Sequence, residues 1–86
     1  MTTDRDRAEN ATDEQLALRG LRLRVGLEYK AITSDARLYQ RRGDKVLADA
    51  KETIARSLYL QLQNIESELA AVGQPVPIEQ RVCWAS

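Results

Sequence analysis

The most constraining feature of the sequence is an apolar ladder between residues 47 and 72. Its members recur at spacings of three and four, which places them in one stripe of an α-helix. They are Leu47, Ala50, Ile54, Leu58, Leu62, Ile65, Leu69 and Val72. Leu47, Leu58 and Leu69 are also eleven residues apart, the spacing of three turns in an almost straight helix. We therefore expect a helical packing scaffold.

Start and stop signals place a helix before this ladder. Thr12 followed by Gln15 fits a capping box, which predicts a helix that begins at about residue 13. It is expected to cover about 13–42, because Gly43 is suited to end a helix and Asp44 to start the next one.

The ladder helix itself is predicted over about 45–72 and is closed by Gly73 and Pro75. Apolar side chains are almost absent at the start of the chain, and two prolines near the end prevent helix formation there. The predicted fold is all-α, with a disordered tail over 1–12, a two-helix hairpin domain over 13–73 and an extended C-terminal arm over 74–86.

Apolar residues fall on two opposite faces of the first predicted helix. One face carries Leu16, Leu23, Leu27, Ala31 and Leu38. The other, which we assign to a subunit interface, carries Leu18, Leu21, Val25, Tyr29, Ile32 and Tyr39. The second helix covers only one face, through a hairpin core of Leu47, Ile54, Leu58, Leu62, Ile65 and Leu69. We therefore expect a homodimer or a higher homo-oligomer, with a dimeric four-helix bundle as the simplest form.

The stretch 21–31 leaves an alternative open, because its apolar and polar residues alternate with the period of a β-strand. Its composition favours a helix, since Leu, Arg, Glu, Lys and Ala are better helix formers than strand formers. The surrounding region is basic, with eight basic residues against three acidic ones over 19–45. The candidate nucleic-acid contacts are Arg19, Arg22, Arg24, Lys30, Arg37 and Arg41.

If 21–31 formed a strand followed by two helices, the order of elements over about 21–60 would resemble a ribbon-helix-helix repressor. Such a resemblance implies a dimer that inserts a two-stranded ribbon into the major groove, with Arg22 and Arg24 on one face. A dimeric DNA-binding repressor is therefore the alternative function.

Several classes of function lack their usual residues. The chain has no histidine and one cysteine, which excludes the common triads and His-containing zinc sites. Its four glycines are isolated and form no phosphate-binding loop. We predict neither a catalytic residue nor a metal or cofactor.

The C-terminal arm is expected to dock through Val82 and Trp84, either on its own hairpin or in the groove of a partner. No apolar run reaches the length of a membrane span, and the chain starts with charged residues and holds a single cysteine, so a cytoplasmic protein is expected. The sequence as a whole favours a non-enzymatic interaction module, a small self-associating helical adaptor or an accessory subunit of a larger complex.

Overall fold

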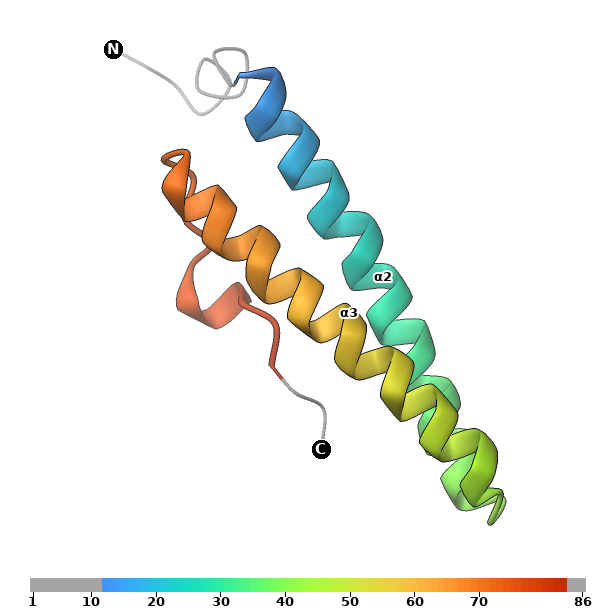
Figure 1. The fold of residues 1–86 in the computed structure, drawn as a ribbon. Helices are drawn as coiled ribbons and strands as arrows, with labels where there is room; N and C mark the ends of the chain where they lie inside the picture. The colour runs from blue at the N-terminus through green and yellow to red at the C-terminus, as the bar shows by residue number, and fades with distance from the viewer. Residues whose placement is uncertain (1–11, 84–86) are drawn as a thin grey trace.

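The computed structural model describes residues 12–83, and this part of the chain is all-helical. Helix α2 spans Asp13–Arg41, helix α3 spans Lys45–Ala71, and a short 3₁₀ helix, η1, spans Ile78–Gln80. The two long helices run antiparallel and pack against each other (Figure 1). The predicted helical hairpin is confirmed, with each helix one residue shorter at its C-terminal end than expected.

Local capping fixes the starts of both helices. The Thr12 hydroxyl accepts a hydrogen bond from the Gln15 backbone N–H at 3.2 Å, and the Gln15 side-chain oxygen accepts one from the Thr12 N–H at 2.9 Å. At α3, the Asp44 carboxylate accepts from the Leu47 N–H at 3.2 Å. Backbone donors that the first turn of a helix leaves unpaired are satisfied in this way.

Two glycines end the helices. Gly43 has a φ of 77° and Gly73 a φ of 82°. This is a left-handed backbone conformation that residues with a Cβ rarely adopt. The first of these turns reverses the chain between α2 and α3. The second releases the chain into the C-terminal segment, which we define as residues 74–83.

Residues 21–31 lie inside α2, so the strand required by the ribbon-helix-helix alternative is not formed. Residues two positions apart lie on nearly opposite sides of a helix. Because α2 has two opposite apolar faces, apolar residues at every second position fall on one face and then on the other. The described residues contain no strand that could enter a DNA groove.

The core lies in the seam between the helices. It consists of Val25 and Tyr29 from α2, Ala55, Leu58, Leu62, Ile65 and Leu69 from α3, and Val76 from the C-terminal segment. Near the loop, the buried residues are alanines: Ala36, Ala48 and Ala55 are 5% exposed or less. Leu47 and Ile54, which we expected in the core, are instead 42% and 45% exposed. The short turn at Gly43 brings the helices together at this end, so small side chains occupy the seam.

The face of α2 that packs against α3 is the one that we assigned to a subunit interface. Val25 and Tyr29, assigned to a subunit interface, are buried in the hairpin core, and Leu18 and Ile32 pack against it. Of the other two residues of that set, Leu21 is 36% exposed and Tyr39 is partly buried. The opposite face, with Leu16, Leu23, Leu27, Ala31 and Leu38, is exposed.

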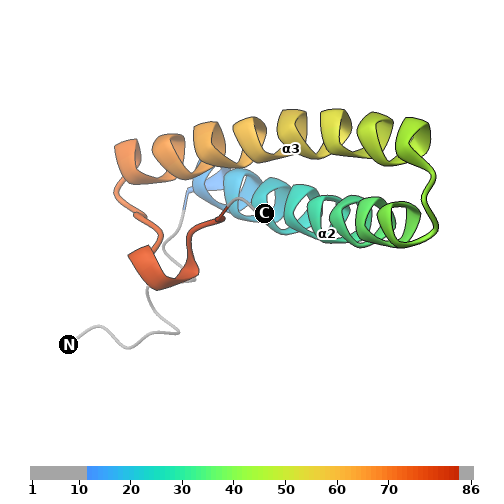
Figure 2. The same cartoon turned by 90° about the horizontal axis from the view of Figure 1, so that it is seen from below.

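The C-terminal segment folds back over one side of the hairpin, near the end where α2 begins and α3 ends (Figures 1 and 2). It starts extended, as Pro75 and Pro77 require, but then forms η1, which we did not predict. Val76 is 7% exposed and belongs to the core. The hairpin nevertheless stays elongated: its radius of gyration is 16.0 Å, compared with about 12 Å for a compact domain of this length.

Candidate protein-binding surface

The outer leucine face of α2, defined by Leu16, Leu23, Leu27 and Leu38, is a row of apolar side chains that the described part of the chain leaves exposed. These side chains are 47%, 67%, 61% and 39% exposed. Single exposed leucines are ordinary on protein surfaces, but a row along one helix face is typical of an interaction site. Leu16, Leu27 and Leu38 are eleven residues apart, so they stay aligned along α2.

Basic side chains border this face along one flank. Arg19, Lys30, Arg37 and Arg41 are all exposed and follow one another at spacings of eleven, seven and four. Gly20 and Gly26 lie in the same helix, and a Cβ built at either glycine would meet nothing within 4 Å. Packing within the chain therefore does not require these glycines, although glycine in a helix interior costs about 1 kcal/mol relative to alanine.

A row of polar side chains on α2 forms hydrogen bonds with backbone carbonyls that follow α3. Gln15 donates from Nε2 to the Val72 carbonyl at 2.6 Å, Arg22 donates to the Gln80 carbonyl at 2.7 Å, and Tyr29 donates from its hydroxyl to the Cys83 carbonyl at 3.1 Å. The three donors are seven residues apart, which places them in one row along the helix.

This row explains which face of α2 meets α3. Both faces supply leucines, valines or alanines, so apolar burial alone does not distinguish them. Only the face with Val25 and Tyr29 brings the donors of Gln15, Arg22 and Tyr29 next to the carbonyls that follow α3. The sequence signal for this choice is three hydrogen-bond donors at heptad spacing, which a prediction from apolar periodicity does not use.

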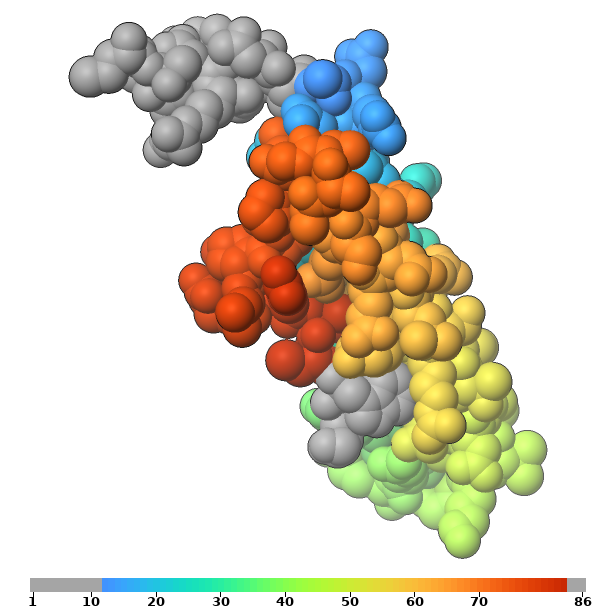
Figure 3. Space-filling model, turned by 60° about the vertical axis from the view of Figure 1, so that its left-hand side comes forward, coloured from blue at the N-terminus to red at the C-terminus, as the bar shows by residue number. Residues whose placement is uncertain are grey.

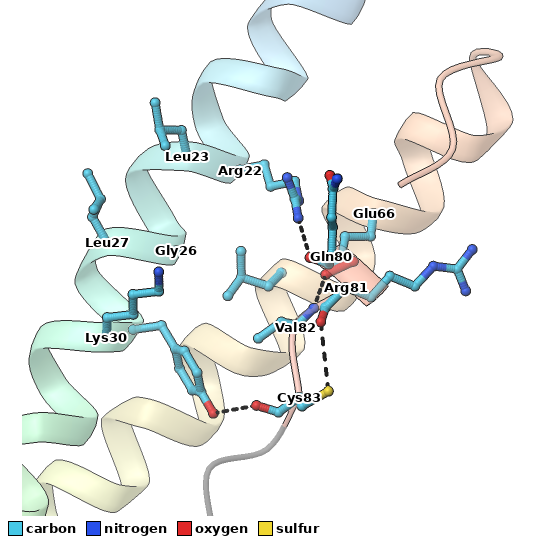
Figure 4. Close-up of a pocket in the computed structure, with 12 residues that line it drawn as sticks. Arg22, Leu23, Gly26, Leu27, Lys30, Glu66, Gln80, Arg81, Val82 and Cys83 are labelled. Carbon is cyan, nitrogen blue, oxygen red and sulfur yellow. Dashed lines mark hydrogen bonds between the residues drawn. The ribbon is translucent and has the colours of Figure 1, made fainter. Parts of the chain in front are cut away.

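A groove of about 360 Å³ separates α2 from the C-terminal segment (Figure 4). Leu23, Gly26 and Leu27 line its α2 side, and Val82 and Cys83 line the other side. The outer leucine face therefore continues into this groove. In the space-filling view, the C-terminal segment forms a raised ridge on the hairpin (Figure 3).

Glu66 lies beneath the ridge and is 8% exposed. Its Oε1 accepts a hydrogen bond from the Val82 N–H at 3.1 Å, whereas its Oε2 has no hydrogen-bond partner in the structure. Val82, predicted as a docking residue, packs partly buried against the core. Trp84, the other predicted docking residue, lies outside the described residues. Glu66 was not singled out by sequence, because a glutamate on a helix is ordinarily solvated.

We expect Glu66→Ala to loosen the C-terminal segment, because the Val82 N–H loses its acceptor and the side chain leaves a void. The free energy of unfolding should fall by about 1–3 kcal/mol. Trypsin should also cut faster after Arg81. Chemical denaturation measures the change in the free energy of unfolding, and timed proteolysis measures the cleavage rate. Glu66→Gln retains the acceptor oxygen and serves as the control. Equal cleavage rates for Glu66→Ala and the wild type would contradict an anchoring role for Glu66.

The six candidate nucleic-acid contacts do not form one surface. Arg22 is bound to the Gln80 carbonyl and is therefore part of the fold. Arg19, Lys30, Arg37 and Arg41 follow the basic flank described above, and Arg24 is also exposed on α2.

Chemical sites of other kinds are not found in the part of the chain that the structure describes. No three side chains among Cys, Asp and Glu within residues 12–83 are grouped so that they could hold a metal ion. Neither long helix combines the length and the hydropathy of a membrane span.

Comparisons with known proteins add no assignment: no protein-family model, no curated protein and no solved structure matches this chain.

Proposed function

We propose that this chain is a non-enzymatic protein–protein interaction module, a small helical adaptor or accessory subunit that self-associates. The observation that carries the proposal is the outer leucine face of α2. Leu23 and Leu27 are 67% and 61% exposed, although the hairpin has a separate core that already covers the other face of the same helix. The outer leucine face is therefore suited to contact with another chain.

The shape of the hairpin supports the same proposal. Two helices have one seam between them, and a chain of this size buries little apolar surface by itself. The radius of gyration of 16.0 Å reflects this open shape. A second chain on the outer leucine face would give α2 a helix on each side and would add buried leucines to a small core.

The one described cysteine, Cys83, is exposed and unpaired. An exposed free thiol is suited to a reducing compartment, and we propose the cytoplasm as the site of action.

The test compares two leucine-to-lysine variants. Leu27→Lys places an ammonium group in the middle of the outer leucine face, where a dry interface would leave it unpaired. We expect the wild type to sediment as a dimer or larger particle, and Leu27→Lys to weaken association by at least tenfold, because a tenfold change corresponds to only about 1.4 kcal/mol. Analytical ultracentrifugation across a concentration series measures both.

Leu60→Lys is the matched control. Leu60 is 58% exposed, almost the same as Leu27, but it lies on α3 and outside the core cluster. This variant should sediment like the wild type. A wild-type chain that stays monomeric up to high micromolar concentration would refute self-association. If Leu27→Lys and Leu60→Lys associated equally strongly, the interface would lie on a surface other than the outer leucine face.

A further inference from the structure

The leucines of the outer face are arranged symmetrically about Leu27. Leu16 and Leu38 each lie eleven residues from it, and eleven residues close three helical turns. We propose that a second copy of this chain docks antiparallel on α2 around a two-fold axis at Leu27. This inference rests on the proposed function and adds the identity of the partner surface and its register. Leu27 then faces its own equivalent, and Leu16 faces Leu38 of the second copy.

Side-chain sizes are complementary in this register. Leu23, the most exposed leucine of the face, is level with Ala31 of the second copy, because both are four residues from the axis. Gly20 and Ser34, seven residues from the axis, are level with each other in the same way. All four residues are exposed in the hairpin. Leu23 therefore meets a small residue, and the Gly20–Ser34 pair is small on both sides, which allows two helices to pack closely.

The charges at the ends of α2 favour the antiparallel direction. Asp13 and Glu14 lie in its first turn, Arg41 lies in its last turn, and Arg42 follows it. Antiparallel pairing places the acidic end of one copy beside the basic end of the other, and it also opposes the two helix dipoles. Parallel pairing would place acidic ends together and basic ends together.

Repulsion remains in the antiparallel register, because Arg19, eight residues before the axis, comes nearly level with Arg37 of the second copy, ten residues after it, and the two-fold axis repeats this contact. Both side chains are exposed, and solvent screening keeps interactions between such charges weak. Burial of one leucine side chain contributes more than a screened surface charge pair costs. The leucine contacts therefore exceed the repulsion.

Disulfide trapping tests the register. The background variant is Cys83→Ser, into which Leu16→Cys, Leu27→Cys or Leu38→Cys is introduced, and each protein is oxidised mildly. A disulfide forms only when two Cα atoms come within about 7 Å. We expect Leu27→Cys to form a covalent dimer by itself. Leu16→Cys and Leu38→Cys should each remain uncrosslinked alone, since equivalent positions would be about 33 Å apart, but should crosslink when mixed.

The outcomes separate the register from the proposed function. Efficient crosslinking of all three variants alone would indicate parallel pairing, which overturns the inference and leaves self-association intact. A dimer in ultracentrifugation with no crosslink at residue 27 would place the interface elsewhere and would also overturn it. Leu60→Cys in the same background controls for random collisions. A monomeric wild-type chain would refute the proposed function together with the inference.

Discussion

Leu69→Ala is expected to lower the free energy of unfolding by about 3–5 kcal/mol, the range for removing a large, well-packed core side chain. Leu69 is 2% exposed and is the largest fully buried side chain of the described residues. It belongs to the cluster that joins α2, α3 and Val76. Its carbonyl also accepts the Gln74 N–H at 2.8 Å, where the chain leaves α3. The void would therefore form where three parts of the structure meet.

The expected loss is large relative to the total free energy of unfolding. Small domains are stable by only about 5–15 kcal/mol, so Leu69→Ala should bring a substantial unfolded population within reach of mild denaturant. Urea denaturation followed by circular dichroism measures the change. Leu60→Ala removes an equal number of atoms from a side chain that is 58% exposed, and its effect should stay below about 0.5 kcal/mol. Similar losses in both variants would contradict the assignment of the core.

The sequence was sufficient for the features of this fold that depend on neighbouring residues. The capping box of Thr12 and Gln15 and the glycines at 43 and 73 act within one turn of chain, so their spacing predicts the ends of the helices. The apolar ladder correctly predicted the buried residues in the central and C-terminal part of α3, which are Leu58, Leu62, Ile65 and Leu69.

Features that depend on the pairing of distant segments were not predicted. The position of Leu47 and Ile54 depends on how closely the turn at Gly43 draws the helices together. The choice between the two faces of α2 depends on hydrogen bonds from Arg22 and Tyr29 to carbonyls more than fifty residues away along the chain. Helical periodicity contains neither kind of information, since it describes each helix separately.

Val25→Asp follows from this choice of face and is expected to unfold the hairpin. Val25 is 6% exposed and belongs to the core cluster. A carboxylate in its place would be buried without a partner of opposite charge, at a cost of several kcal/mol. The loss approaches the total stability of a chain this small. Circular dichroism at 222 nm and a thermal melt should show a largely unfolded protein at room temperature.

Leu23→Asp gives the matched comparison, because Leu23 lies two residues away on the same helix but is 67% exposed on the outer leucine face. This variant should keep the helical signal of a folded hairpin and lose self-association. The opposite pattern, a folded monomer from Val25→Asp and an unfolded chain from Leu23→Asp, would show that α3 covers the outer leucine face instead. Both variants introduce an aspartate into the middle of the same helix, only two residues apart. The local cost to helix formation and the neighbouring charges are therefore similar in the two variants. Any difference between the variants therefore reports which face of α2 the hairpin buries.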